Sequence, residues 1–162
     1  MITVGFNRRN LLAAGGSVLA TGVAGPLLPA HAQGLAPTPS MSGGSNNYRK
    51  GAPTVDRIGK GGFWMSGTVR RAGDGAPLAG QRIQIWAHTT EGQEEDQRSH
   101  GATLTDKDGK FRLEMPQIVP IFGQPHGHLA YDSGEFKTVF LRPVMRSAKE
   151  TKLEAHFVLQ PA

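Results

Sequence analysis

The stretch that decides the fold runs from Gly75 to Trp86 and reads GAPLAGQRIQIW. Its first half is rich in glycine and proline, which favour turns. Its second half opens a run of alternating residues from Gln81 to Thr89, the pattern of a β-strand. One face of that strand is expected to face the core and the other to face solvent. The core face would carry Ile83, Ile85 and Ala87, and the solvent face Arg82, Gln84, Trp86 and His88.

Short segments of the same kind lie on both sides of this stretch, each bounded by turn residues. The tetrapeptide Asp106-Lys107-Asp108-Gly109 predicts a tight hairpin between two of them. No segment after residue 32 has an apolar period of 3.6 residues over three turns, so no long helix is expected. The predicted strands are 63–69, 81–89, 103–105, 111–113, 126–130, 136–141 and 153–159. We therefore expect an all-β fold, a single β-sandwich of about seven strands.

The N-terminal residues have the order of an export signal. Arg8 and Arg9 precede an apolar stretch diluted by glycine, and Ala30-His31-Ala32 has the pattern of a cleavage site. Paired arginines followed by two leucines are typical of the twin-arginine route. An uncleaved anchor or a core helix is the alternative, which the glycines disfavour. We expect a signal peptide (1–32), an extended arm or linker (33–62) and the β-sandwich domain (63–162). The protein would then be periplasmic or secreted, with no stable membrane anchor after cleavage.

Composition excludes several classes of function. The 162 residues include 18 Lys and Arg and 13 Asp and Glu, a net charge of +5. Removing the predicted signal removes Arg8 and Arg9, which leaves 16 cations against 13 anions, or +3. The remaining cations form no stripe interleaved with aromatic residues, so nucleic acid is not an expected partner. The absence of cysteine excludes disulfides, thiolate metal sites and cysteine nucleophiles.

Four motifs follow one another in an order that resembles the intradiol ring-cleavage dioxygenases. They are Gly67-Thr68-Val69, the Gly75–Trp86 stretch, the hairpin from Thr105 to Phe111, and the Pro125-His126-Gly127-His128 segment. The first three also occur in transthyretin-like sandwiches, so it is their order, ending in two histidines, that carries the resemblance. The similarity covers residues 62–131 and implies an intradiol dioxygenase/transthyretin-like β-sandwich.

The resemblance implies a metal site at His126 and His128. Enzymes of that family hold a ferric non-haem iron with two histidines and two tyrosines. The iron activates a bound catecholate towards O2, and the ring is cleaved between the two hydroxylated carbons. Alternate residues of a strand point to the same face, so both imidazoles can reach one metal ion. A small catechol-like aromatic molecule is the implied substrate.

The tyrosine ligands of the family do not carry over. The position that matches the first tyrosine holds Glu94, and the segment 119–122 that matches the second contains none. The chain has only Tyr48 and Tyr131, and Tyr131 is expected to face away from the two histidines. The arginine that the family keeps just before its histidines, thought to steady the substrate, is matched at best by Gln124, our one catalytic candidate.

Two other ligand sets are open. Glu94 with His126 and His128 would form a two-histidine, one-carboxylate set suited to ferrous iron or another divalent metal. Alternatively His88 and His100, which flank the same acidic loop, would join the pair and favour copper or zinc. Tyr48 would join either set if the arm folds back over the domain. Each of these side chains could also serve the structure alone, as a loop, turn or surface residue that binds no metal.

Three functions therefore stay open. The first is an exported intradiol dioxygenase-like protein that acts as a metal-dependent oxygenase on a catechol-like aromatic. The second is a non-catalytic β-sandwich binding module, and the third is a periplasmic metal-binding protein that uses histidines. A homo-oligomer is compatible with all three. The sequence has no motif of a serine hydrolase, a phosphate-binding loop or a helical zinc protease.

Overall fold

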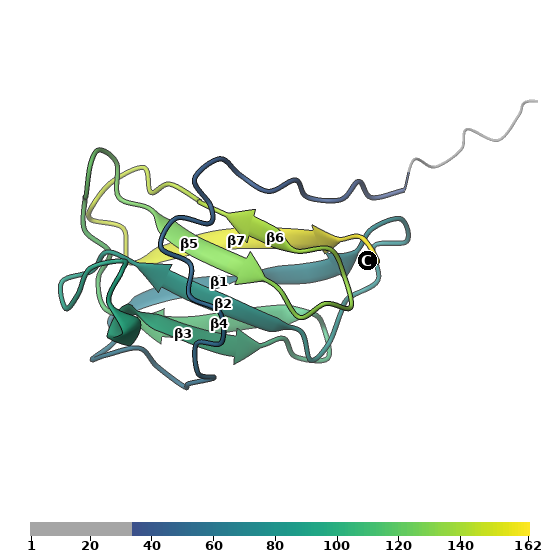
Figure 1. Cartoon of the computed structure of the whole chain (residues 1–162), viewed down its shortest axis with the longest axis horizontal. Helices are drawn as coiled ribbons and strands as arrows, with labels where there is room; N and C mark the ends of the chain where they lie inside the picture. The colour runs from purple at the N-terminus through teal and green to yellow at the C-terminus, as the bar shows by residue number, and fades with distance from the viewer. Residues whose placement is uncertain (1–33) are drawn as a thin grey trace, which may run out of the picture. The chain divides into compact units, whose positions relative to one another are not determined.

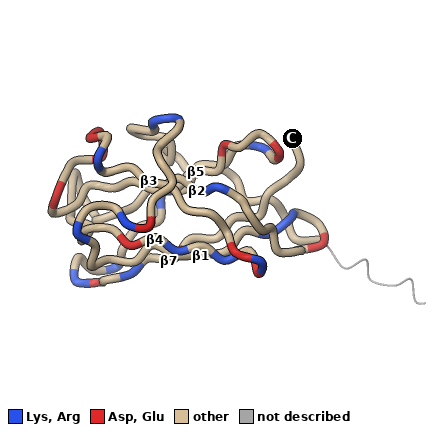
Figure 2. The backbone as a smooth tube through the Cα atoms, turned by 90° about the horizontal axis from the view of Figure 1, so that it is seen from below, with Lys and Arg blue, Asp and Glu red and all other residues tan. Residues whose placement is uncertain are grey.

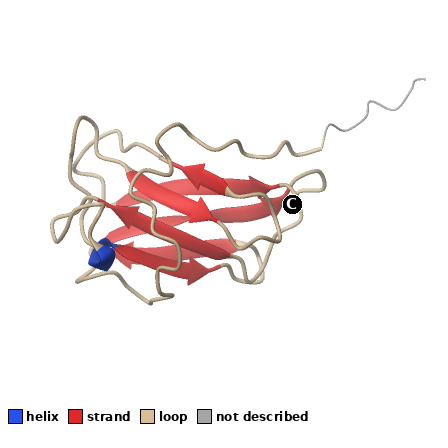
Figure 3. Cartoon of the chain, viewed as in Figure 1, coloured by secondary structure: helices blue, strands red, loops and turns tan. Residues whose placement is uncertain are grey.

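The structure is a computed structural model that describes residues 34–162, and the predicted signal peptide lies outside them. The described part consists of seven strands and one short 3₁₀ helix, η1 (Gln97–Ser99) (Figure 3). The strands are β1 (Phe63–Arg71), β2 (Arg82–Ala87), β3 (His100–Leu104), β4 (Lys110–Met115), β5 (Gly127–Tyr131), β6 (Val139–Leu141) and β7 (Lys152–Leu159).

The strands form two sheets that pack face to face (Figure 1). One sheet has the order β4-β1-β7, with β1 and β7 parallel, and the other has the order β3-β2-β5-β6 with antiparallel pairs. Alternate residues of both sheets meet in one core, for example Met65 and Phe157 from one side and Ile83 and Leu129 from the other. The expected all-β sandwich is confirmed.

All seven strands differ from the predicted ranges at one end or both, and three of these differences have a clear structural reason. β3 begins at His100 rather than Thr103, because His100 pairs with Trp86 directly after η1. β6 is shorter than the predicted segment 136–141, because Phe136 pairs with Pro161 as an isolated bridge. His126 lies just before β5, in a bridge to Val144, instead of opening the strand.

The arm lies across the outer face of the four-stranded sheet, as Figure 1 shows in dark blue. Its backbone bonds to successive strands: Met41 N–H donates to Phe140 O at 2.8 Å, and Val55 N–H donates to Ala102 O at 3.0 Å. Between these points the indole Nε1 of Trp86 donates to Asn46 O at 2.9 Å. Both faces of this sheet are therefore covered.

This cover corrects one expectation about β2. Gln84 and Trp86 were expected to face solvent, but both are fully buried under the arm. The amide of Gln84 donates to Arg49 O at 2.7 Å, so its polar group is satisfied by the arm backbone. Alternation identified the two faces of β2 correctly, but it does not report what lies on top of a face.

Charged side chains are spread over the described part of the molecule. Figure 2 shows Lys and Arg interspersed with Asp and Glu on loops and strand ends. Among residues 34–162, no helix is long and apolar enough to cross a membrane.

Candidate metal centre

The sheet register brings three separated side chains to one end of the sandwich. β2 and β5 are antiparallel neighbours, with Trp86 opposite His128 and Ala87 opposite Gly127. The loop that leaves β2 and the residues that enter β5 therefore lie at the same end of the sheet. That loop carries Glu94, and the entry to β5 carries His126 and His128.

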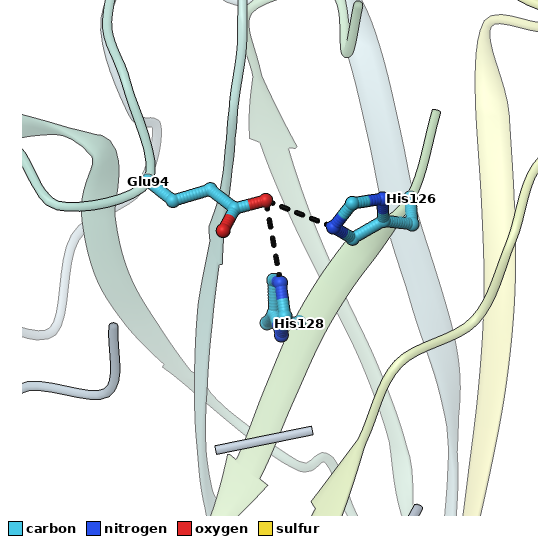
Figure 4. A group of neighbouring side chains, drawn as sticks. All are labelled: Glu94, His126 and His128. Atoms are coloured by element: carbon cyan, nitrogen blue, oxygen red, sulfur yellow. Dashed lines mark ion pairs between the residues drawn. The ribbon is translucent and has the colours of Figure 1, made fainter. Parts of the chain in front are cut away.

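The carboxylate of Glu94 lies between the two imidazoles (Figure 4). Its Oε1 is 2.9 Å from His126 Nε2 and 3.4 Å from His128 Nε2. The three ligand atoms lie within 4.8 Å of one another. Glu94 is 6% exposed, His126 5% and His128 0%. Buried carboxylates and imidazoles require partners, so this cluster needs a physical explanation.

Hydrogen bonds at the far nitrogens fix both imidazoles with Nε2 towards the carboxylate. His126 Nδ1 lies 2.9 Å from Gln124 O, and His128 Nδ1 lies 3.1 Å from Gly44 O. A carbonyl oxygen can only accept, so each Nδ1 carries a proton and donates it. The neutral form of each ring then presents a lone pair at Nε2. Metal-binding histidines in proteins are oriented in the same way.

With both imidazoles in the neutral form, two of the three converging atoms have no hydrogen-bond partner. Neither Glu94 Oε1 nor His128 Nε2 makes an aligned hydrogen bond, although both are inaccessible to solvent. Two lone pairs and a carboxylate oxygen converge on one point, which is unfavourable without a cation between them. The chemistry of the donor set therefore fits a divalent metal ion.

In the metal-free protein a proton takes part of that role. Burial alone would raise the pKa of the Glu94 carboxyl, but the two imidazoles and the amide of Asn47 outweigh burial and hold it well below its usual range. The Glu94 carboxylate in turn raises the pKa of His126, against burial, which would lower it. A bound metal would displace the proton that His126 shares with Glu94.

His100 and His88 do not join this cluster. His100 Nε2 lies 2.6 Å from the backbone oxygen of Glu94, and its ring stacks on Trp86 with centroids 5.5 Å apart. Burial lowers its pKa, so His100 is a neutral side chain that holds the loop of Glu94. His88 is half-buried, and its Nδ1 has no partner among the described residues.

Gln124 and the tyrosines also lie away from the converging atoms. The side chain of Gln124 is exposed, and only its backbone oxygen serves the site, through His126. The hydroxyl of Tyr48 donates to Asp132, at the far end of β5 from His126, and its ring packs on Trp86 and Phe140. Tyr131 is buried in the core between the sheets, on the face of β5 opposite His128.

Two arm residues hold the cluster in place, and sequence reasoning did not identify them. Asn47 Nδ2 donates to Glu94 Oε2 at 3.0 Å, and Gly44 O accepts from His128. Neither residue is part of a periodic pattern or a motif. The only available signal was the high asparagine and glycine content of the arm, which is equally typical of a loop.

A cavity of about 550 Å³ opens beside the cluster. Its polar wall includes Asn46, Asn47 and Arg142, and its apolar wall is formed by Ile121 and Phe122. Glu94 and His126 also line it, together with Gln93 and Glu95 of the same loop. A space of this volume is suited to a small organic molecule.

Replacing Asn47 with alanine is expected to weaken metal binding about tenfold. Residues that support a metal ligand typically change the metal affinity about 10- to 100-fold. The lower end applies here because Asn47 is exposed. The variant loses the amide that holds Glu94 Oε2 but keeps all three ligands. Calorimetric titration with Zn²⁺ measures the change, with Asn46→Ala as the neighbouring control. An unchanged affinity in Asn47→Ala would show that the hydrogen bond does not position Glu94.

The phenol of Tyr48 is expected to stay protonated at pH values where a free phenol ionises. Burial raises its pKa from 10.0 to about 12, the hydrogen bond to Asp132 and its charge add to this, and Arg82 opposes it. Because the folded pKa is the higher one, this stabilisation is complete below pH 10 and is lost as the pH rises towards 12. The stability difference between wild type and Tyr48→Phe should shrink over that range. Ultraviolet titration showing a phenolate in the native protein at pH 10 would contradict the assignment.

The sequence matches no protein-family model and no curated protein. The fold, however, is similar to several solved structures. Hydroxyquinol 1,2-dioxygenase from Pseudomonas putida DLL-E4 aligns with a TM-score of 0.59 and 12% identity, over 82% of this chain and 69% of that one. 3-Chlorocatechol 1,2-dioxygenase from Rhodococcus opacus 1CP aligns with a TM-score of 0.58 and 15% identity, over 80% of this chain and 73% of that one.

A third similar structure is the dioxygenase domain of a dioxygenase carbohydrate-binding protein fusion from Streptomyces sp. SirexAA-E. It aligns with a TM-score of 0.59 and 14% identity, over 78% of this chain and 99% of that domain. Identities this low establish the fold and leave the activity open. Residues 34–162 therefore have the intradiol dioxygenase-like β-sandwich fold that the order of motifs predicted.

Proposed function

We propose that Glu94, His126 and His128 bind one divalent metal ion, and that the protein uses ferrous iron there to oxidise a small catechol-like aromatic with O2. The observation that carries the proposal is the convergence of three buried ligand atoms, two of which have no hydrogen-bond partner. Two histidines and one carboxylate with open positions are the ligand set of non-haem ferrous oxygenases. The similar structures, which are dioxygenases by name, support the same class of reaction.

The residues of the chain have distinct roles in this proposal. Bound iron would supply the positions at which the hydroxyl groups of the substrate and O2 meet. His126 and His128 hold it through Nε2, with their rings fixed by carbonyl acceptors. Glu94 supplies one negative charge, and Asn47 keeps its second oxygen in place. Ile121 and Phe122 offer an apolar wall for the ring.

The proposed reaction balances without an external reductant. One molecule of O2 and one catechol are consumed, and the carbon–carbon bond between the two hydroxylated carbons breaks. The ring gives up four electrons to O2, and both oxygen atoms enter the product, a dicarboxylic acid. Because no tyrosine lies at the converging atoms, we expect none of the visible colour that tyrosinate gives with ferric iron.

Metal analysis and oxygen uptake test the proposal on protein purified from iron-replete cells. We expect one metal ion per chain, no tyrosinate colour, and O2 uptake with at least one of catechol, protocatechuate and hydroxyquinol. Protein that holds no metal and is not stabilised by added iron, copper or zinc would rule out the metal centre. Protein with stoichiometric metal but no O2 uptake would favour the metal-binding alternative.

We also propose that residues 1–32 direct export by the twin-arginine route, which carries folded proteins. The support is the paired Arg8 and Arg9, the apolar stretch and the Ala30-His31-Ala32 site. Replacing both arginines with lysine keeps the charge and should leave the uncleaved protein in the cytoplasm. Cell fractionation measures this, with Lys50→Arg as a control substitution. Export that is unaffected by the double change would exclude this route.

A further inference from the structure

We propose that the cavity beside the metal centre binds its aromatic ligand through a carboxylate on the ring, and that Arg142 recognises this carboxylate. The inference rests on the proposed function and specifies its substrate class. It starts from Arg142, a cation at the cavity wall whose guanidinium has no acceptor among the described residues.

Arg142 follows directly after β6 and lines the cavity together with Glu94 and His126. It is half-buried, and its stem passes beside the arm: a Cβ on Gly43 would lie 3.5 Å from Arg142 Cδ. The arm and the strand end therefore restrict where the guanidinium can go. A side chain held in this way loses less entropy when it binds a ligand.

The guanidinium of Arg142 has no acceptor in the described part of the chain. The polar contact that its side chain makes among residues 34–162 is with His126 Nδ1, 3.4 Å from Nη2. That nitrogen already donates its proton to Gln124 O and cannot also accept one. None of the ion pairs among residues 34–162 involves Arg142. The five donors of a guanidinium are suited to a planar, bidentate anion such as a carboxylate.

The charges around the cavity favour an anionic ligand. A divalent ion, Arg142 and the carboxylates of Glu94 and Glu95 sum to one net positive charge. Glu95 is exposed, so solvent and salt screen its contribution, and the charge that the ligand meets inside is more positive. The apolar side chains of Ile121 and Phe122 complete a site for a ring that carries an acidic group at one edge.

Binding of two matched probes tests this inference. Protocatechuate and catechol share the two hydroxyl groups and differ by one carboxylate. With protein loaded with Zn²⁺, which does not turn over, calorimetry should show protocatechuate binding about tenfold more tightly than catechol. In Arg142→Gln that preference should disappear, while the affinities for Zn²⁺ and for catechol stay within about twofold of wild type. Arg142→Lys should keep part of the preference, because the charge remains.

The control is Arg146→Gln, which removes the same charge from an exposed position outside the cavity and should keep the full preference. Equal binding of the two probes to wild type, or a preference that survives in Arg142→Gln, would overturn the inference. If Zn²⁺ does not bind, the metal proposal fails by itself. Benzoate, which has no hydroxyl group to offer a metal, then tests Arg142 alone. It should bind metal-free wild type but not Arg142→Gln, and the absence of binding to wild type would end the inference.

Discussion

Replacing Glu94 with glutamine is expected to abolish stoichiometric binding of a divalent metal and to leave the fold intact. Glutamine has nearly the same shape but removes the only negative charge among the three converging side chains. Supporting residues around a metal typically change its affinity 10- to 100-fold, so loss of a charged ligand should exceed about 100-fold. The amide of glutamine can also donate to His128 Nε2, which has no partner at present. The metal-free variant should therefore stay folded, although it loses the charge that pairs with His126.

Titration with Zn²⁺ and thermal unfolding with and without metal measure these two effects. Glu95→Gln is the matched control, because it makes the same change at the next, exposed residue. Wild type and the control should both be stabilised by Zn²⁺, and Glu94→Gln should not. Normal metal binding in Glu94→Gln would exclude the carboxylate as a ligand. The set that includes His88 and His100 would then be the next to test.

The strands could be predicted because their signals are local. The turn between β3 and β4 is an example, although the predicted hairpin was wrong: the two strands do not pair, because β3 and β4 belong to different sheets. Asp106 Oδ1 accepts from the backbone N–H groups of Asp108 and Lys110, and Gly109 has a φ of 71°. Aspartate and glycine were needed at those positions, so the turn could be read directly from four residues. Alternation likewise marked the two faces of β2.

Part of the candidate site could be predicted for a similar reason. The two histidines are separated by one residue, and this spacing keeps both near one face even though His126 lies just outside β5. The position of Glu94 came from the resemblance of the motifs. Whether these residues bind metal remains a prediction, but the structure does bring the three together.

The contributions of the arm and of β6 could not be predicted. Asn47 is 47 residues from its partner Glu94, and Gly44 is 84 residues from His128. Contacts at such separations depend on how the whole domain folds, and no periodic pattern encodes them. Arg142 is a similar case, since its approach to His126 follows from the pairing of β5 with β6.

The largest change in stability is expected from Gly67→Ala in β1. In the middle of a strand, alanine is intrinsically better than glycine by about 0.5–1 kcal/mol. At this position, however, an added Cβ would lie inside van der Waals contact with the backbone oxygen of Ala155 and 2.7 Å from Phe111 Cζ. These residues belong to β7 and β4, the two strands that flank β1. A backbone atom cannot rotate away, so β1 and β7 must separate where they pair.

We expect Gly67→Ala to lower the free energy of unfolding by about 3 kcal/mol, the upper end of the usual cost of overpacking, because the clash outweighs the gain in propensity. Gly127→Ala in β5 is the matched comparison. There the atom in the way is Met65 Cε, the end of a flexible side chain, so the loss should be less than about 1.5 kcal/mol. Urea unfolding of the metal-free proteins measures both values. Similar losses in the two variants would show that the close approach of β1 and β7 is not what requires glycine at position 67.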